Sequence, residues 1–321
     1  MGGIIEFSKL RQDVMKLYET GGGKTYYCGF KCLAPHYSIK EGGVTDWTGY
    51  PASGKTELLL EMLINCNKWY GHKHLIYMPD AGTAAEVAGK LMHKLSGKQF
   101  DEFFYNKRGE KIAINNRLSQ AEVDRYLPEI HDSFKIFDPT TYKNKNTRSK
   151  SVTPKEYWDF AVQNKAELGI FGAVIDSWNY MHHDTKGFAR EDKWLEDVLS
   201  YRNELAEQHN LHLHTIIHPT SAKRDKNGNI IAPDMHSLKG GSEWANNAKS
   251  VVVAHRDFGA EITTVKVAKA KPKIVGIAGE CNLQYDLQKG KYFEIDFTDG
   301  GRNKYAERLE NTRTQSTLSF N

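Results

Sequence analysis

The sequence predicts an α/β fold with a mainly parallel, twisted sheet flanked by helices and with antiparallel strands added at its C-terminal edge. From about Val44, short β-rich runs alternate with helical segments, which is the pattern of a parallel sheet wrapped by helices. After Glu261 the helical segments stop and consecutive strands follow, with a turn around Gly290 that is typical of an antiparallel pair at a sheet edge.

The individual elements are placed from their residue types. Runs rich in apolar and β-branched residues predict strands at 74–78, 134–138, 171–176, 211–218, 250–255, 262–268 and 283–295. Capping boxes predict helix starts, because a hydroxyl and a glutamate three residues later satisfy each other's free amides. Three such pairs occur: Thr83 with Glu86, Ser119 with Glu122, and Thr153 with Glu156.

An amphipathic helix is expected near the N-terminus, over residues 8–19. It carries a narrow apolar stripe made of Leu10, Val14, Leu17 and Tyr18. The glycines at 21–23 separate this helix from the rest of the chain, so residues 1–24 are predicted to be a helix with a flexible linker. Residues 25–298 are then expected to form one domain, and residues 299–321 a flexible tail.

The composition limits the compartment and the class of partner. No apolar run approaches the roughly 20 residues that span a bilayer, and no secretion leader opens the sequence, so a cytoplasmic protein without a membrane partner is expected. Four scattered cysteines fit a reducing compartment, and a zinc interpretation of Cys28, Cys32 and His36 lacks a fourth ligand nearby. The net charge of +4 does not by itself indicate a nucleic-acid partner. Any such binding must come from local basic clusters, and two occur, at 143–150 and 223–226. The alternative for each cluster is a solvated loop.

The strongest motif is a complete G-x-x-x-x-G-K-[ST] sequence between a β-rich run and an apolar-periodic helix. It consists of Gly49, Tyr50, Pro51, Ala52, Ser53, Gly54, Lys55 and Thr56. The glycines let backbone amides curl around phosphate oxygens, Lys55 can reach the terminal phosphates, and Thr56 supplies a hydroxyl to magnesium. The sequence therefore predicts a site for ATP, or another NTP, with Mg²⁺. A glycine-rich turn without a ligand would leave Lys55 unexplained.

Two strand-end aspartates are candidates for ATP hydrolysis. Asp176 ends the run at 171–176, where a P-loop ATPase needs an acidic residue to hold magnesium. Asp80 follows the run at 74–78 and offers a carboxylate to polarise the attacking water. An ordinary turn or helix-cap aspartate is the alternative for each, but the P-loop favours the catalytic interpretation.

The ordered series of motifs resembles the RecA-like motor domain of the DnaB and Twinkle group of helicases, especially phage versions. The resemblance spans roughly residues 25–295 and rests on the P-loop together with DSWN at 176–179, IHPT at 217–220, KGGSEW at 239–244 and HRD at 255–257. It implies a RecA-like P-loop NTPase fold. It also implies a replicative DNA helicase that forms a hexameric ring, hydrolyses ATP at subunit interfaces and translocates on single-stranded DNA.

The resemblance also assigns roles to residues outside the P-loop. His218 would contact the terminal phosphate and report its loss, because an imidazole can donate a hydrogen bond to a phosphate oxygen. The loop at 220–241 would grip single-stranded DNA through Lys223, Arg224, Lys226, Lys239, Gly240, Gly241 and Ser242. The loop after Asp176, with Lys186 and Arg190, is a weaker candidate for the channel wall.

Two positions depart from the family pattern. The family has Lys-x-Arg as a finger that acts on the neighbouring subunit's site, whereas Lys269 and Lys271 stand here, and lysine cannot make the bidentate fork of arginine. The family usually has glutamate where this chain has Asp80. Arg256 would stack on adenine, with an opposing face from Tyr292 or Phe297.

Assembly and partners follow from the same resemblance. The helix at 8–19 would pass onto the adjacent subunit to close the ring; the alternative is a helix that folds back on its own domain. Many relatives carry a primase or a helical domain before the motor and this sequence shows neither, so priming is expected from a separate primase or from a missing part of the protein. The tail is similar to the Q-x-x-L-x-F peptide that docks into bacterial sliding clamps, although matches this short are common by chance; the residues concerned are Gln315, Leu318 and Phe320. If the chain is phage-encoded, its compartment is the bacterial host cytoplasm.

Two other functions remain open at this stage. A RecA-like recombinase or a clock-type ATPase would share the core but form filaments or double rings, and the HPT and GGSEW stretches argue against it. A DNA-binding assembly module would bind ATP and hydrolyse it weakly, an alternative that the departures at Asp80 and Lys271 favour.

Overall fold

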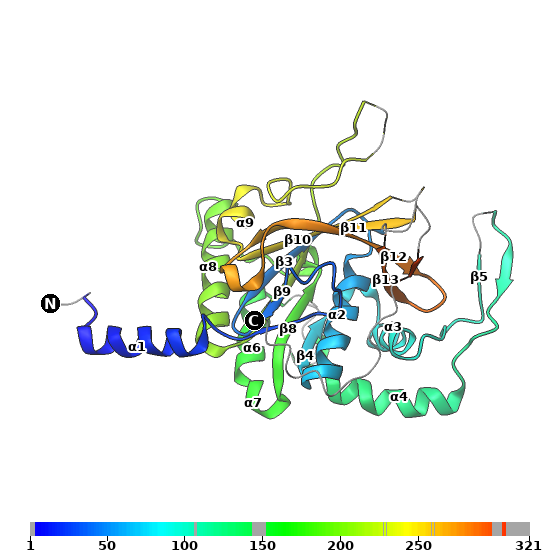
Figure 1. Cartoon of the computed structure of the whole chain (residues 1–321), viewed down its shortest axis with the longest axis horizontal. Helices are drawn as coiled ribbons and strands as arrows, with labels where there is room; N and C mark the ends of the chain where they lie inside the picture. The colour runs from blue at the N-terminus through cyan, green and yellow to red at the C-terminus, as the bar shows by residue number, and fades with distance from the viewer. Residues whose placement is uncertain are drawn as a thin grey trace.

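The computed structural model describes residues 4–105, 108–142, 152–226, 228, 230–257, 259, 261–296 and 304–305. A ten-stranded sheet runs through the molecule in the order β14-β13-β12-β11-β10-β3-β9-β8-β4-β7 (Figure 1). The strands of its parallel part are β10 (Ser250–Asp257), β3 (Val44–Thr48), β9 (His212–Ile217), β8 (Ile170–Asp176), β4 (Lys73–Tyr77) and β7 (Phe134–Ile136).

The remaining strands of the sheet are antiparallel. They are β11 (Ile262–Ala270), β12 (Gly279–Asp286), β13 (Lys291–Asp296) and β14 (Lys304–Tyr305). Gly290 closes the turn between β12 and β13 with a φ of 63°, and its N–H donates to the carbonyl of Asp286 at 2.8 Å. A side chain is disfavoured at that positive φ, so glycine fits the turn. The predicted parallel sheet with antiparallel strands at its C-terminal edge is confirmed.

Helices cover both faces of the sheet and create two hydrophobic clusters. One cluster contains side chains from α2 (Lys55–Tyr70), α3 (Ala84–Ser96) and α4 (Gln120–Ser133), and the other contains side chains from α6 (Pro154–Gln163), α8 (Glu191–His209) and α9 (Ser242–Asn247). Strand side chains alternate between the faces, so Val174 of β8 joins the first cluster and its neighbours Ala173 and Ile175 join the second.

The helix starts follow the predicted capping chemistry. Thr83, Ser119 and Thr153 each accept a hydrogen bond from the backbone of the predicted glutamate, and each capping box is complete. The short elements are β1 (Thr25–Tyr26), β2 (Ile39–Lys40), β5 (Phe103–Tyr105), β6 (Lys111–Ala113), α5 (Pro139–Tyr142), α7 (Lys165–Leu168) and the 3-10 turns η1 (Pro79–Ala81), η2 (Trp178–Tyr180) and η3 (Lys273–Val275).

The N-terminal helix α1 (Phe7–Thr20) projects from the rest of the molecule (Figure 1). It buries none of its residues, and its apolar stripe is exposed: Leu10 is 46% exposed, Val14 53% and Leu17 60%. The alternative in which this helix folds back on its own domain is therefore wrong for this structure. Exposed apolar residues in one row are typical of a surface that another chain covers.

Several sequence predictions lie outside the described residues. These are the basic cluster at 143–150, Phe297, most of the tail at 299–321, and the clamp-like peptide with Gln315, Leu318 and Phe320. Among the helices that the structure describes, none is long and apolar enough to span a bilayer.

Buried histidines lie in the middle of the sheet. His74 of β4 is fully buried, stacks on Phe134, and has no hydrogen-bond partner for either ring nitrogen. On β9, His212 bonds the carbonyl of Lys40 at 2.6 Å and the hydroxyl of Thr45 at 3.0 Å. Burial lowers the pKa of His74 to about 3 and the pKa of His212 to about 4.

We predict that acid destabilises the protein through these rings. The unfolded chain protonates its histidines near pH 6.5 while the folded state keeps them neutral, so the free energy of unfolding falls as the pH falls from about 6.5 to about 4. Each ring contributes a loss of about 2 kcal/mol between roughly pH 7.5 and pH 5. Urea unfolding at both pH values measures this. His74→Leu should reduce the loss of unfolding free energy between the two pH values by the contribution of one ring. An unchanged loss would contradict the claim that buried His74 causes part of it.

Candidate nucleotide site

The P-loop connects β3 to α2 at the carboxyl edge of the parallel strands. Ala52 has a φ of 60° and Gly54 a φ of 88°, so the loop turns through left-handed conformations before α2 begins at Lys55. A Cβ on Gly49 would overlap the carbonyl oxygen of Ala254 and the hydroxyl of Ser53. Glycine is therefore required at Gly49 by close backbone approach, as the motif predicts.

Lys55, Thr56 and Asp176 come together at the start of α2. The hydroxyl of Thr56 donates to Oδ2 of Asp176 at 2.6 Å, and the ammonium of Lys55 donates to the carbonyl of Tyr50 at 3.2 Å. Asp176 is 1% exposed, and burial raises the pKa of its carboxyl to about 6, although the Thr56 hydrogen bond and Lys55 act in the opposite direction. Burial also lowers the pKa of Lys55.

Asp80 and His218 lie on the neighbouring strand ends. Nε2 of His218 is 3.4 Å from Oδ2 of Asp80. Burial and the nearby Lys55 lower the pKa of His218, while Asp80 raises it. Asp80 also raises the pKa of Tyr180, in η2. Sequence reasoning missed Tyr180, because a tyrosine four residues after Asp176 matches no motif.

The residues present fit a magnesium nucleotide. Among the described residues, buried hydroxyls without a hydrogen-bond partner occur at Thr48, Ser53 and Ser177, at or next to the ends of β3 and β8. Ligands and their water satisfy such groups in binding sites. The described residues hold no group of three or more His, Cys, Asp or Glu side chains suited to a metal. Mg²⁺ binds through one or two protein oxygens together with phosphates and water, and the hydroxyl of Thr56 and the carboxylate of Asp176 offer such oxygens.

A network of buried hydrogen bonds and ion pairs, which the motifs do not reveal, holds the P-loop and the start of α2. The hydroxyl of Tyr292 donates to the carbonyl of Gly54 at 3.2 Å, and the N–H of Tyr292 donates to Glu61 at 2.8 Å. Lys94 lies 2.7 Å from Glu57. Burial raises the pKa of the Glu57 carboxyl, but Lys94, Lys90 and Tyr285 together outweigh burial and lower this pKa to about 2. These partners come from α2, α3 and β13, so only the folded chain brings them together.

The expected adenine-stacking pair is corrected in part. Tyr292 is 1% exposed and lies against the P-loop, so it has no free face for a base, and this expectation was wrong. Arg256 lies near the end of β10, which contacts the P-loop at Ala254, so it remains near the nucleotide site.

The candidate DNA loop extends between β9 and α9. Its exposed cations are Lys223, Arg224, Lys226 and Lys239. Gly240 has a φ of 109°, which favours glycine, and a Cβ there would crowd the side chains of Leu195 and Trp244. A Cβ on Gly241 would meet open space, and Ser242 begins α9 in an exposed position. The weaker candidates Lys186 and Arg190 are exposed, and Arg190 pairs with Asp192.

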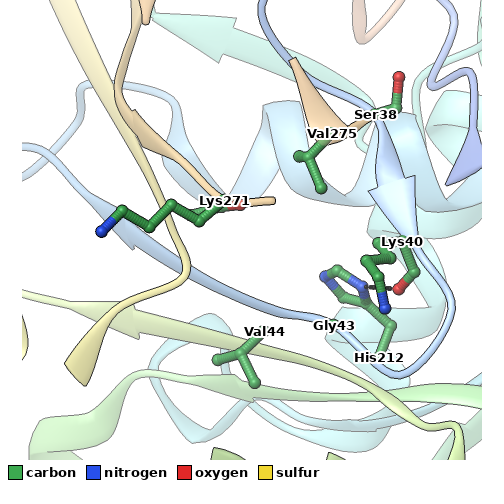
Figure 2. Close-up of a pocket in the computed structure, with 8 residues that line it drawn as sticks. Ser38, Lys40, Gly43, Val44, His212, Lys271 and Val275 are labelled. Carbon is green, nitrogen blue, oxygen red and sulfur yellow. Dashed lines mark hydrogen bonds between the residues drawn. The ribbon is translucent and has the colours of Figure 1, made fainter. Parts of the chain in front are cut away.

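Lys269 and Lys271 lie at the opposite edge of the sheet. Ala270 pairs with Ser250, the first residue of β10, so about 15 Å of strand separates Lys271 from the chain's own P-loop. Lys271 lines a small pocket with Ser38, Lys40, Gly43, Val44, His212, Ser250 and Val275. Figure 2 shows its exposed side chain extending away from His212 and Lys40. A role for Lys271 in hydrolysis therefore requires the site of another subunit.

Comparison with known proteins agrees with this geometry. No protein-family model matches the chain. The Twinkle homolog protein, chloroplastic/mitochondrial, of Arabidopsis thaliana is 25% identical over 307 residues, an alignment that covers 93% of this chain and 41% of that protein. The chain thus spans less than half of that relative's length.

Two solved structures share the fold. One, described as an ATPase domain, matches with a TM-score of 0.65 and 14% identity, over 91% of this chain and 99% of that one. A structure described as a DnaB-like replicative helicase and its interactions with primase matches with a TM-score of 0.62 and 14% identity, over 90% of this chain and 67% of that one. Sequence and fold thus confirm a RecA-like domain that resembles those of the DnaB-like and Twinkle-like helicases.

Proposed function

We propose that the chain is the motor of a ring-forming replicative DNA helicase, which hydrolyses ATP or another NTP at subunit interfaces to translocate on single-stranded DNA and unwind duplex. One observation carries the proposal. The P-loop residues Lys55 and Thr56 share an edge of the sheet with Asp176, Asp80 and His218, and His218, directly after β9, leads into a basic loop.

Hydrolysis in this site is a matter of positioning and electrostatic stabilisation, without a covalent intermediate. Lys55 and the P-loop amides hold the phosphates. Thr56 and Asp176 would hold Mg²⁺, and the ion would supply positive charge to the phosphate oxygens. Asp80 orients the attacking water from the end of β4, across the site from the P-loop lysine.

His218 is joined to the DNA loop through the backbone. The carbonyl of His218 accepts the N–H of Lys239 at 3.2 Å, and the N–H of Thr220 donates to the carbonyl of Ser237 at 2.8 Å. These two hydrogen bonds join the two ends of the loop just after β9, next to His218. A shift of His218 when the terminal phosphate leaves therefore moves the base of the loop, which is the coupling that a motor needs.

The loop suits single-stranded DNA of any sequence. Lys223, Arg224 and Lys226 are exposed near its tip, where ammonium and guanidinium groups pair with phosphates. An isolated antiparallel bridge between Arg224 and Ile230 gives the described part of the tip a hairpin form.

A hexamer completes the site. Helix α1, with the linker up to residue 24, lies on the adjacent subunit and covers its apolar stripe there, while residues 25–298 form the ATPase domain. Lys271 then acts on the neighbour's nucleotide, because its own P-loop is out of reach. A lysine can supply the charge of a finger, though not the fork of an arginine.

Partners and compartment remain predictions. Single-stranded DNA and a separate primase are the expected partners, and clamp binding through the C-terminal peptide has no support from the comparisons. The Arabidopsis relative is named as chloroplastic/mitochondrial, and the bacterial host cytoplasm applies to this chain if it is phage-encoded.

The alternative is an ATP-binding assembly module with weak hydrolysis. The contact between Asp80 and His218 favours it, because a carboxylate held by a histidine is less available to water. A recombinase would bind DNA and hydrolyse ATP but would not unwind a fork.

We predict that single-stranded DNA stimulates ATP hydrolysis and that Lys55→Ala abolishes it. Loss of the lysine removes the main positive charge at the terminal phosphates, so the rate should fall by about 100-fold or more. Steady-state hydrolysis with and without DNA measures this, with Lys289→Ala as a control at a lysine on the β12–β13 turn. Wild-type binding of ATP without hydrolysis above the mutant level would favour the assembly module.

We predict that the lysines of the loop set the salt dependence of DNA binding. Replacing Lys223 and Lys226 by alanine should weaken binding to oligo(dT) and reduce the slope of log affinity against log salt by about 0.7 for each phosphate that the loop no longer neutralises. Fluorescence anisotropy at several KCl concentrations gives both quantities. An unchanged slope in the double variant would place the DNA elsewhere on the chain.

We predict that two inactive variants complement each other. Lys55→Ala removes the P-loop lysine and Lys271→Ala removes the finger, so each ring alone should be inactive. In mixed rings about one interface in four pairs an intact P-loop with an intact finger from its neighbour, so about that share of activity should return. Equimolar mixing before the hydrolysis assay tests this. An inactive mixture would contradict action in trans.

A further inference from the structure

The carbonyl of Gly54, where the P-loop enters α2, accepts two hydrogen bonds. The N–H of Leu58 donates to it at 2.9 Å, and the hydroxyl of Tyr292 donates to it at 3.2 Å. The first bond belongs to the start of α2, whereas the second comes from β13, and Tyr292 is 238 residues away from Gly54 in the sequence. A carbonyl oxygen has two lone pairs, so these two donors use both.

Tyr292 is a fixed donor. It is 1% exposed, and its backbone N–H donates to Glu61 of α2 at 2.8 Å. Its ring lies 4.8 Å, between centroids, from the ring of Tyr285, which is its partner in the β12–β13 ladder. Burial and the nearby carboxyls of Glu57 and Glu61 raise the pKa of the Tyr292 hydroxyl, so the hydroxyl keeps its proton.

Gly54 and Tyr292 are matched to each other in shape. A Cβ on Gly54 would lie 2.0 Å from the hydroxyl oxygen of Tyr292, which is shorter than any van der Waals contact. The φ of 88° at Gly54 also favours glycine. The tyrosine hydroxyl therefore reaches the main chain of the P-loop because no side chain stands between them.

The carbonyl of Gly54 belongs to the same peptide unit as the N–H of Lys55. A trans peptide unit is planar, so its C=O and its N–H point in opposite directions. Lys55 is the first residue of α2, and its N–H is one of those that have no partner inside the helix. In P-loops such N–H groups bind phosphate oxygens. Holding the carbonyl of Gly54 therefore also sets the direction of a phosphate-binding N–H.

We propose that Tyr292 is a positioning residue of the nucleotide site, whose hydroxyl holds the carbonyl of Gly54 and so directs the N–H of Lys55 at the phosphate chain. The inference rests on the proposed function and deepens it, because it names the group that fixes a phosphate-binding amide. Tyr292 itself contacts neither the base nor a phosphate. Ligands with a chain of phosphates depend on this contact, whereas a nucleoside monophosphate depends on it much less.

Three variants of the full chain test this. Tyr292→Phe removes only the hydroxyl, and Tyr292→4-aminophenylalanine keeps a donor on the same ring. Tyr285→Phe is the matched control, because its hydroxyl donates to Glu57 at 3.0 Å and not to the P-loop. Displacement of a fluorescent ADP analogue, with Mg²⁺ and without DNA, gives the affinities for ATP, AMP and inorganic tripolyphosphate. Steady-state hydrolysis gives KM and kcat, and thermal unfolding reports whether each variant is folded.

The expected pattern follows the phosphates. Tyr292→Phe binds ATP and tripolyphosphate about tenfold more weakly, near the lower end of what a hydrogen bond to a charged group contributes, while its affinity for AMP is unchanged. KM for ATP rises by a similar factor and kcat is kept, because the amide holds the phosphates equally before and during transfer. The 4-aminophenylalanine variant lies between Tyr292→Phe and the wild type, since an aromatic amine is a weaker donor than a phenol. Tyr285→Phe matches the wild type.

Other outcomes overturn the inference. Wild-type affinity of Tyr292→Phe for ATP and tripolyphosphate means that Leu58 alone holds the carbonyl. A loss for ATP without a loss for tripolyphosphate means that Tyr292 contacts the base or the ribose. A loss for AMP as well, or an equal loss in Tyr285→Phe, means that the packing of β12 and β13 matters and the hydroxyl does not.

Two further results are kept apart from these. If Tyr292→Phe does not fold, the 4-aminophenylalanine variant decides, because its preference for tripolyphosphate over AMP must then fall below that of the wild type. A wild type that binds ATP no better than AMP would instead contradict the proposed nucleotide site. The affinities are measured without DNA, so a wild type that DNA does not stimulate would contradict the proposed motor and leave this test unaffected.

Discussion

Parallel pairing of β3, β9, β8 and β4 is the constraint on which the candidate site depends. These strands are neighbours in the sheet, and their carboxyl ends lie at one edge. The P-loop follows β3, and Asp176 ends β8, so the two meet within hydrogen-bond distance even though 120 residues separate Thr56 from Asp176. Asp80 and His218 follow the other two strands, and adjacent strands about 4.8 Å apart bring all these groups within reach of one nucleotide.

Buried charges hold this arrangement in register. Arg202 of α8 makes two hydrogen bonds to Asp46 of β3, at 2.5 and 3.1 Å, and both side chains are fully buried. Such a pair adds little net stability, but separating it leaves an uncompensated charge in the interior. On the other face, Lys94 joins Glu57 to the carbonyl of Gly290. Both networks fix the segments on either side of the P-loop without entering the nucleotide site.

The nucleotide site and the proposed finger lie at different edges of the same sheet. Its carboxyl edge carries the nucleotide site and the base of the DNA loop, whereas the opposite edge carries Lys271. In the proposed assembly, one subunit would keep its own phosphate-binding groups on one side and offer Lys271 to a neighbour on the other. Head-to-tail contacts of this kind would give a ring where the rotation between subunits closes. The apolar stripe of α1 is exposed in the single chain.

The sequence by itself determined the fold class, the order of the strands along the chain, the helix caps and the P-loop, because these depend on local periodicity and on residues that are close together in the chain. The resemblance added His218 and the DNA loop. Only the tertiary structure decided that Tyr292 supports the P-loop and does not stack on adenine, that Gly240 packs against Trp244, and that Lys269 bonds α9. Those outcomes depend on contacts between segments far apart in sequence, whose burial and hydrogen-bond partners no local pattern specifies.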